Sequence, residues 1–541
     1  MTEMSGGEAI VQSLLANGVD TVFGLPGAQT YSLFDALHRA GERVRVFCPR
    51  HEQTAGYMAF GYAKSTGRVG VYTVVPGPGF LNSTAALCTA HGASTPVVCV
   101  TGQVPTAFIG SGKGHLHELP DQLATARTLV KWAERIEKPA DAPSLVAEAF
   151  RRAQSGRPQP VVLEMAWDAM ESKEAVELVP PAPPAPPSRP DPDAIAQAAE
   201  LLNSAANPML MVGSGAFGAE AEVLELAELL QAPVVSFRSG RGVVPDDHYL
   251  GFTCAAGCER WYETDVLVGI GSRLELQWFR WPHRDDGPRI VNIDVDPAQV
   301  DRVSPDVAIV ADACEGLRAL KEAIGRERPS RHEEFEAVKR ATEAAIQIIQ
   351  PHVGFLAAIR DVLPRDGFFV EELCQAGFAS YYAFPVYEPR TFVTSGHQGT
   401  LGFGFPTALG VKAGNPDKAV VSITGDGGFL FGLPDLATAV QYGLDLVTVV
   451  FNNDAYGNVV RDQERFYGGR VIGSELRNPD FVALAESFGA SGYRARTPDE
   501  LRRALEQALG AGSPAVIEVP VDRRDEVSPW KFLMPGSPYG A

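Results

Sequence analysis

The residues best suited to chemistry lie between positions 420 and 460. Asp426 stands in a Gly-Asp-Gly-Gly turn after a β-branched run, and Asn453 ends a second apolar run 27 residues later. A turn with almost no side chains lets phosphate oxygens approach backbone N–H groups. A carboxylate and an amide oxygen beside a phosphate suit Mg²⁺, which prefers oxygen ligands. The spacing therefore predicts a site for a phosphorylated ligand and a hard cation.

A second candidate is Glu52, which stands where a short apolar run at 45–48 meets a predicted helix. An acidic residue at the start of a helix is often only a favourable partner of the helix dipole. A carboxyl group beside apolar neighbours can instead take part in acid–base chemistry, because burial raises its pKa. The residue's position alone leaves both interpretations open.

The elements around Asp426 and Asn453 should bring them to one edge of a sheet. Residues 420–424 and 446–451 are predicted strands, and 429–441 has the apolar spacing of a helix. The carboxyl ends of parallel strands form the usual ligand edge of an open α/β sheet. Both side chains are expected at that edge.

The Gly-Asp-Gly-Gly turn followed by Asn-Asn resembles the diphosphate- and Mg²⁺-binding motif of thiamine-diphosphate enzymes. The resemblance implies that Mg²⁺ is bound by Asp426, the side chain of Asn453 and the carbonyl group of Ala455. The glycines that would contact the diphosphate of the cofactor are Gly425, Gly427 and Gly428.

Four motifs in the first third are similar to the pyrimidine-binding domain of the acetolactate synthase and benzaldehyde lyase group. They are GLPG, RHEQTAGYMAFGYA, PGPGFLN and VTGQVP, in this order. By this resemblance Glu52 is the catalytic glutamate, which bonds to the aminopyrimidine ring of the cofactor. Pro26 and Asn82 fall on further cofactor-binding positions of the same motifs.

The segment after VTGQVP carries two histidines, His115 and His117, among glycines that suggest a mobile loop. Acetolactate synthases usually have a phenylalanine-glutamine pair where Leu116 and His117 stand. A histidine could shuttle protons near neutral pH, and it could equally be a surface residue of the loop. We take His117 as a candidate catalytic residue and His115 as a candidate pocket residue.

The run TSGHQGTLGFGFPTALG resembles the loop that holds the bend of the cofactor. The resemblance implies that the carbonyl group of Gly399 accepts from the cofactor's amino group and that Leu401 is an apolar wedge, and Gln375 is a further cofactor-binding candidate. Polar residues at neighbouring positions predict a substrate that is polar beyond its keto acid group. These are His397, Gln398 and Asn458.

The middle third contains a G-x-G-x-x-G run at 213–218 that suggests a dinucleotide site. The acidic residue expected after the next strand is missing, because that position supplies Arg238 and Arg241 instead. In relatives this domain binds FAD, ADP or nothing. We expect a structural domain, with FAD as the alternative.

The length of the chain and the breaks in its sequence pattern predict the domain organisation. The 541 residues are too many for one core. Short apolar runs alternate with helical periods, which is typical of α/β proteins, so three doubly wound parallel-sheet domains are expected. The expected segments are a pyrimidine-binding domain at 1–176, a proline-rich linker at 177–192, a central domain at 193–328, a linker helix at 329–350 and a diphosphate-binding domain at 351–541.

The composition of the chain limits its partners and compartment. A net charge of −19 argues against nucleic acid or an anionic membrane as the main partner. No signal peptide or membrane span is recognised. Seven scattered cysteines do not form a disulfide framework, so reduced thiols in the cytoplasm are expected.

The resemblance implies an enzyme that uses thiamine diphosphate and Mg²⁺ to cleave or form a C–C bond next to a carbonyl. Its expected substrates are 2-oxo acids, aldehydes or acyloins. It also implies a homodimer or homotetramer, because Glu52 of one subunit meets the diphosphate site of another. The alternatives are an acyloin or 2-hydroxyacyl-CoA lyase, an FAD-dependent enzyme similar to pyruvate oxidase, and a catalytically silent relative that binds the cofactor.

Overall fold

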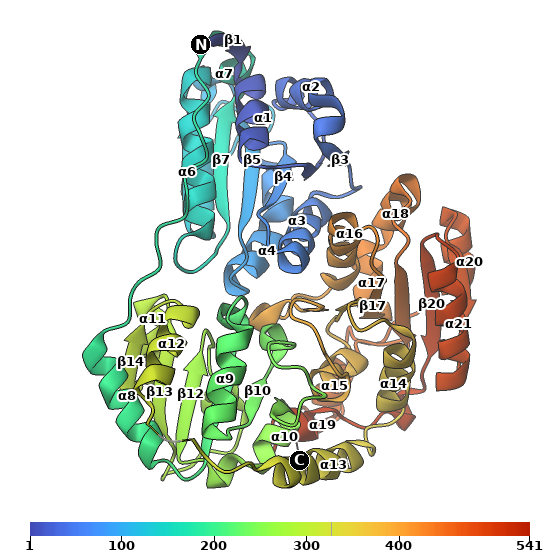
Figure 1. Ribbon diagram of the computed structural model, residues 1–541. Helices are drawn as coiled ribbons and strands as arrows, with labels where there is room; N and C mark the ends of the chain where they lie inside the picture. The colour runs from blue at the N-terminus through green and yellow to red at the C-terminus, as the bar shows by residue number, and fades with distance from the viewer. Residues whose placement is uncertain (326, 541) are drawn as a thin grey trace.

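The computed structural model describes residues 1–325 and 327–540 and contains three six-stranded sheets, one in each third of the chain. Within these sheets all neighbouring strands are parallel. Helices cover the sheets (Figure 1), which explains why the strands are nearly continuous apolar runs. The predicted fold class, three doubly wound α/β domains, is confirmed.

The first domain has the strand order β3-β2-β4-β5-β7-β6. A short antiparallel pair, β1 with β8, lies beside this sheet. The strands are β1 (Thr2–Ser5), β2 (Thr21–Gly24), β3 (Arg45–Phe47), β4 (Gly70–Val74), β5 (Val97–Gln103), β6 (Trp132–Ile136), β7 (Val161–Ala166) and β8 (Lys173–Val176). The helices are α1 (Gly6–Ala16), α2 (Tyr31–Ala40), α3 (Glu52–Thr66), α4 (Pro78–Gly92), α5 (Gln122–Arg127), α6 (Ala142–Gln154) and α7 (Trp167–Glu171).

The second domain has the strand order β11-β10-β9-β12-β13-β14. Its strands are β9 (Pro208–Val212), β10 (Val234–Ser236), β11 (Gly251–Thr253), β12 (Val266–Ile270), β13 (Arg289–Asp294) and β14 (Val307–Val310). Its helices are α8 (Pro192–Ser204), α9 (Glu220–Leu230), α10 (Cys254–Glu259), α11 (Pro297–Val300) and α12 (Ala313–Ala323).

The third domain has the strand order β16-β15-β17-β18-β20-β19. Its strands are β15 (Phe368–Val370), β16 (Phe392–Val393), β17 (Val420–Gly425), β18 (Val447–Asn452), β19 (Ser491–Arg494) and β20 (Ala515–Pro520). The helices from residue 332 onwards are α13 (His332–Ile346), α14 (His352–Val362), α15 (Gln375–Ala383), α16 (Gly404–Gly414), α17 (Asp426–Gly432), α18 (Leu436–Tyr442), α19 (Gly457–Phe466), α20 (Phe481–Phe488), α21 (Pro498–Gly510) and α22 (Trp530–Leu533).

The helix expected at 429–441 differs in the structure. It begins at Asp426, so Gly427 and Gly428 lie in its first turn rather than in a loop before it. A 3₁₀ turn, Leu433–Asp435, separates α17 from α18. Pro434 lies in this turn and has no N–H to donate to an α-helical hydrogen bond. Because α17 begins at Asp426, directly after β17, the N–H groups of its first turn face the same sheet edge as Asp426.

The first and third domains meet where α3 packs against α16. This contact is close because glycines face backbone atoms across it. A Cβ atom on Gly61 would lie 2.1 Å from the carbonyl oxygen of Thr407, and one on Gly410 would lie 2.0 Å from that of Met58. A hydrophobic core runs from the first domain into the third through this contact, so the helix that starts at Glu52 is fixed to the third domain.

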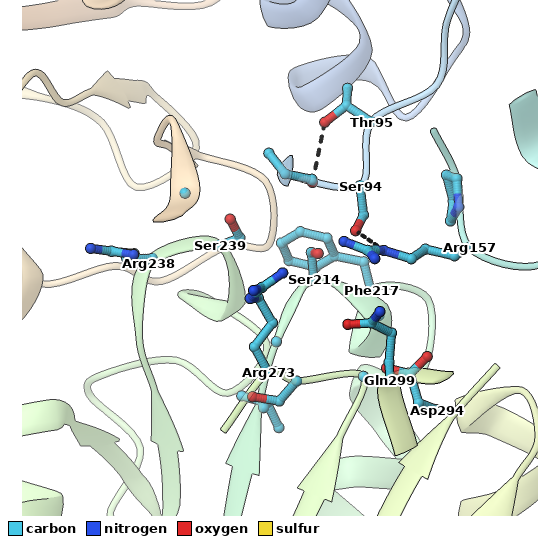
Figure 2. Close-up of a pocket in the computed structure, with 18 of the residues that line it drawn as sticks. Ser94, Thr95, Arg157, Ser214, Phe217, Arg238, Ser239, Arg273, Asp294 and Gln299 are labelled. Atoms are coloured by element: carbon cyan, nitrogen blue, oxygen red, sulfur yellow. Dashed lines mark hydrogen bonds between the residues drawn. The ribbon is translucent and has the colours of Figure 1, made fainter. Parts of the chain in front are cut away.

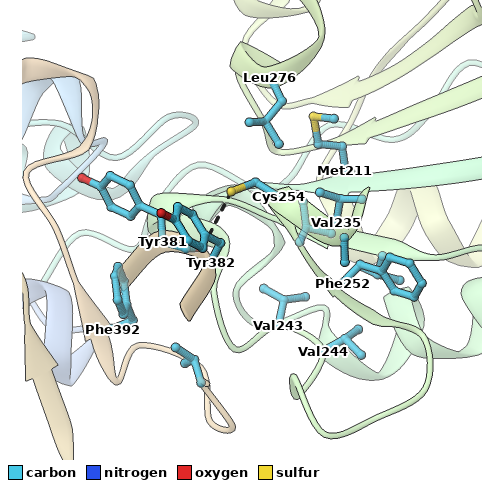
Figure 3. Packing of buried hydrophobic residues seen from close by; sticks show 14 of the residues in the cluster. Met211, Val235, Val243, Val244, Phe252, Cys254, Leu276, Tyr381, Tyr382 and Phe392 are labelled. Atoms are coloured by element: carbon cyan, nitrogen blue, oxygen red, sulfur yellow. Dashed lines mark hydrogen bonds between the residues drawn. The ribbon is translucent and has the colours of Figure 1, made fainter. Parts of the chain in front are cut away.

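The second and third domains share another core (Figure 3), where Tyr381, Tyr382 and Phe392 lie beside side chains of the second domain. The buried guanidinium of Arg241 donates to the carbonyl oxygen of Tyr381 at 2.7 Å and to that of Phe384 at 2.8 Å. These carbonyl groups lie at the C-terminal end of α15, where a positive charge is favourable.

The predicted domain boundaries stay a prediction.

Helix α1 begins with a capping box, since Ser5 and Glu8 each accept from the other's backbone N–H. Among the described residues, no helix is long and apolar enough to cross a membrane.

Candidate active site

Asp426 is 2% exposed at the junction of β17 and α17. Its Oδ1 accepts from the N–H of Gly427 at 2.9 Å, and its Oδ2 accepts from Nδ2 of Asn478 at 2.7 Å and from the N–H of Ala455 at 3.3 Å. Burial raises the pKa of Asp426 to about 6. It forms no ion pair with the described residues. A bound cation would stabilise this buried carboxylate in its ionised form.

Asn453 follows β18 directly, and its Nδ2 donates to Oε2 of Glu526 at 3.0 Å. Its side-chain oxygen is thereby turned away from that carboxylate. Ala455 is buried and forms an isolated bridge with Glu475. A carboxylate, an amide oxygen and a backbone carbonyl are hard oxygen donors, so the predicted residues fit a Mg²⁺ ion.

Glu52 is the first residue of α3 and is partly exposed. Its Oε2 accepts from Nδ2 of Asn82, on α4, at 3.0 Å. A Cβ atom on Gly79 would lie 3.5 Å from its Oε1, so α4 packs closely against the carboxylate. Pro26, another candidate in these motifs, is exposed and lies in the loop after β2.

Gln29 holds His117 near the Glu52 carboxylate. Its Nδ1 lies 2.6 Å from Oε1 of Gln29, while Nε2 of Gln29 donates to the carbonyl oxygen of Leu116 at 2.8 Å. The second bond fixes which way the Gln29 amide points, so Nδ1 of His117 must carry the proton and Nε2 is left as an acceptor. Burial lowers the pKa of His117, and the nearby Glu52 carboxylate opposes that shift.

His115 lies in the same loop but faces Phe108, with ring centroids 4.7 Å apart. The carboxylate of Glu118 accepts from the N–H groups of Gly112, Gly114 and His115 and so orders the loop.

The third-domain candidates occupy two places. Gln375 is buried at the start of α15 and accepts from Arg461 at 2.9 Å. Gly399 ends a 3₁₀ turn with φ of 57°, in the left-handed region that favours glycine. Leu401 follows, partly buried, beside Gly402, whose N–H donates to Oε1 of Glu372 at 3.1 Å. Burial raises the pKa of Glu372 to about 8.

The polar pocket candidates are dispersed. Oδ1 of Asn458 accepts from the indole N–H of Trp530 at 2.7 Å. His397 and Gln398 pack against Gly92 at the end of α4. Burial, together with neighbouring arginines, lowers the pKa of His397 to about 4.

His397 lines a cavity of about 390 Å³ between the three domains, lined also by the Gly213–Gly215 turn. Figure 2 shows Arg157, Arg238 and Arg273 around it. Burial and the neighbouring guanidinium groups lower the pKa of Arg273 to about 10. The crowding of cations would be relieved by an anionic ligand.

Asp294 supplies the carboxylate that the sequence interpretation did not find in the middle domain. It ends β13 and lines the same cavity. Arg238 does follow β10, as expected. The expected acidic residue is thus absent from that strand, while another strand of the same sheet provides one.

The two groups of catalytic candidates share no polar contact within one chain, as far as the described residues show. Among residues 1–325 and 327–540, no hydrogen bond or ion pair joins Glu52, Asn82 or His117 to Asp426 or Asn453. Three residues that support them were missed from sequence: Gln29, Asn478 and Glu526.

A parallel α/β sheet whose edge offers a glycine-rich turn, a buried carboxylate and an amide is suited to binding a phosphorylated cofactor. Three family models match the chain: the N-terminal TPP binding domain of thiamine pyrophosphate enzymes at residues 4–125, their central domain at 195–320 and their C-terminal TPP binding domain at 374–519. The chain belongs to the thiamine pyrophosphate enzyme family.

Curated relatives cover almost the whole chain. A probable acetolactate synthase large subunit of Methanococcus aeolicus is 32% identical over 97% of this chain and 93% of its own length. The acetolactate synthase large subunit of Haemophilus influenzae is 32% identical, with 98% and 97% covered. The probable 2-ketoarginine decarboxylase AruI of Pseudomonas aeruginosa is 33% identical, with 95% and 94% covered. The chain is a thiamine-diphosphate-dependent enzyme of the decarboxylase and carboligase kind.

Proposed function

We propose that the chain acts, with thiamine diphosphate and Mg²⁺, on a 2-oxo acid that is polar beyond its keto acid group. The observation that carries this proposal is the polar group formed by Glu52, His117 and Gln29, where acetolactate synthases usually have phenylalanine and glutamine at positions 116 and 117. The name of one relative supports it, since 2-ketoarginine is a 2-oxo acid with a charged side chain.

The residues present fit both groups. Asp426, Asn453 and the carbonyl group of Ala455 would hold the metal, and the N–H groups of Gly427 and Gly428 would receive the diphosphate. When bound, thiamine diphosphate supplies a nucleophilic carbon and an electron sink next to the substrate carbonyl.

The chain's own side chains then handle protons and orientation. Glu52 would hold or release a proton at its carboxylate, which Asn82 keeps in place. His117 presents Nε2 as an acceptor, since Gln29 occupies Nδ1. The Nδ2 group of Asn458 remains available as a donor, because its Oδ1 already accepts from Trp530.

We further propose a homodimer at least, in which Glu52 of one subunit completes the metal end of another. The absence of a hydrogen bond or ion pair between the two groups, among the described residues of one chain, supports this arrangement. A cytoplasmic location is also proposed: all seven cysteines are free, including the Cys254 and Cys258 pair.

The test is CO₂ release from a panel of 2-oxo acids and 2-hydroxyacyl thioesters, with products identified by mass spectrometry. The panel should pair apolar acids with guanidino, amide and carboxylate analogues of equal length. Preferred release from a polar 2-oxo acid is expected. Cleavage of a thioester or acyloin without CO₂ would instead favour the lyase, and no turnover despite cofactor binding would favour a silent relative.

The cavity between the domains favours a second, separate candidate, a bound nucleotide such as FAD or ADP. Its arginines and the glycine turn suit phosphate groups. The absorption spectrum of the purified protein and mass spectrometry of the released small molecules decide between FAD, ADP and a purely structural domain.

A further inference from the structure

A buried carboxylate lies behind the predicted metal ligand Asn453. The Glu526 side chain is 3% exposed and follows the short 3₁₀ turn Arg523–Asp525 after β20. Its Oε2 accepts from Nδ2 of Asn453, and its Oε1 lies 3.2 Å from Nε2 of His352, the fully buried first residue of α14. Three segments far apart in the sequence therefore meet at one amide.

The chemistry of this contact fixes the direction of the amide. An ionised carboxylate can only accept, so it selects the NH₂ group of Asn453 as its neighbour. The oxygen of the same amide must then point away from Glu526. An asparagine without such a partner could turn its N–H groups toward a cation and repel it.

The residues around Glu526 and Asn453 accommodate their contact. A buried carboxylate is costly unless it is paired, and His352 is the basic group placed against it. Neither ring nitrogen of His352 makes an aligned hydrogen bond with the described residues, and its polar contact with Glu526 is the ion-pair approach of 3.2 Å. A Cβ atom on Gly457 would lie 2.7 Å from Nδ2 of Asn453, so only glycine leaves room for the pair.

The preceding residue repeats the arrangement. Nδ2 of Asn452 donates to Oε1 of the buried Glu518 at 2.8 Å, and its Oδ1 accepts from Asn478, which also donates to Asp426. Both asparagines at the end of β18 are thus oriented by glutamates from the chain's last strand and the segment after it.

We propose that Glu526, backed by His352, is a positioning residue that holds the Asn453 oxygen toward the metal. This inference rests on the proposed function. It assigns to the C-terminal segment a part in metal affinity that is separate from substrate turnover. Outer partners of metal ligands commonly change metal affinity by about 10–100-fold.

The test is direct metal binding to the full-length protein with saturating thiamine diphosphate. Mn²⁺ replaces Mg²⁺ as the probe, and free Mn²⁺ is counted by its electron paramagnetic resonance signal. Glu526→Gln should raise the Mn²⁺ dissociation constant about 10–100-fold, because glutamine can also donate to the Asn453 oxygen. Glu164→Gln is the matched control, a buried carboxylate that accepts from Gln122 in the first domain. It should leave Mn²⁺ affinity unchanged.

A swapped pair separates orientation from stability. In the double variant Asn453→Asp, Glu526→Gln, one carboxylate still faces one amide, and either oxygen of the carboxylate introduced at position 453 can bind the cation. Its Mn²⁺ affinity should be clearly higher than that of Glu526→Gln alone and approach the wild-type value. Unchanged affinity in a folded Glu526→Gln protein, or no recovery in the folded double variant, would overturn the inference. Failure of the wild type itself to bind Mn²⁺ would instead overturn the proposed function and this inference with it.

Discussion

At the Glu52 end of the site, two amide side chains hold two titratable groups. Asn82 donates to Glu52, and Gln29 accepts from Nδ1 of His117. Neither amide changes its charge, so each can hold its partner in place without taking part in proton transfer. We therefore expect the proton balance of the site to depend on Glu52 and His117.

We predict that Glu52→Gln loses turnover by about 10²-fold or more, because an amide cannot give or take the proton that the carboxyl group handles. Binding of thiamine diphosphate, followed by tryptophan fluorescence, should change little. Glu42→Gln, on an exposed 3₁₀ turn, serves as the control. Wild-type turnover in the Glu52 variant would disprove the assigned role.

The Gln29 contact predicts a change in pH dependence. A carboxylate in place of the amide would stabilise the protonated imidazole, so Gln29→Glu should raise the pKa of His117. The limb of the kcat/KM profile that reports His117 should move to higher pH. Gln12→Glu, on α1, should leave the profile in place. An unmoved limb in the Gln29 variant would show that His117 does not control the reaction.

At this scale, sequence reasoning found residues that stand in a fixed local spacing. Asp426 and Asn453 each follow a strand directly, and Glu52 starts the helix that comes after β3, so these positions are visible in the pattern. Gln29, Asn478 and Glu526 act through contacts between distant segments, which leave no local signal. Whether the predicted residues bind cofactor, metal and substrate stays a prediction.

At the scale of elements, the glycine contact between α3 and α16 sets where the helix that starts at Glu52 lies. The two helices approach so closely that Gly61 and Gly410 face backbone carbonyl groups of the opposite helix. Such an approach excludes any larger residue at the contact. It also buries the apolar faces of both helices in one continuous core.

We predict that Gly61→Ala lowers the free energy of unfolding by about 1–3 kcal/mol, because its Cβ would overlap the carbonyl oxygen of Thr407. Denaturant unfolding followed by circular dichroism measures the change. Gly510→Ala, at the end of α21 with open space around it, is the matched control. It should be neutral or stabilising by about 0.4–1 kcal/mol. Equal effects of both substitutions would contradict the role of the contact.

The helix after β17 shows what apolar spacing can and cannot place. The spacing at 429–441 predicted a helix, and one is there. Its start at Asp426 and its interruption at Leu433–Asp435 were missed. The glycines were taken as a turn before the helix, although they lie in its first turn, and the helix was extended through Pro434, which interrupts it.

At the scale of the whole molecule, the proposed dimer combines Glu52 of one subunit with Asp426 of another. This arrangement predicts complementation between two inactive variants. Glu52→Gln and Asp426→Asn, co-expressed with different tags, should form mixed dimers in which one site is intact. Random pairing would restore about a quarter of wild-type turnover. Asp426→Asn with Asn453→Ala, both at the metal end, should restore none. Absence of recovery in isolated mixed dimers would show that each chain builds its own site.

The three-domain fold could be predicted because apolar runs and helical periods alternate along the chain. Parallel strands covered by helices are continuously apolar, and this pattern persists in each third. The cavity between the domains could not be predicted, since it depends on how Arg157, Arg273 and His397, from the first, second and third domains, face one another. Such placement follows from domain packing, for which the sequence carries no periodic signal.

The contact between α3 and α16 also limits how the enzyme can open. Because glycines face backbone carbonyl groups across it, we expect this contact to leave little room for one domain to rotate on the other. We expect entry and exit of substrate to depend on segments outside this contact. The loop ordered by Glu118, which carries His117, is such a segment, and its opening would then set the pace of exchange rather than a domain movement.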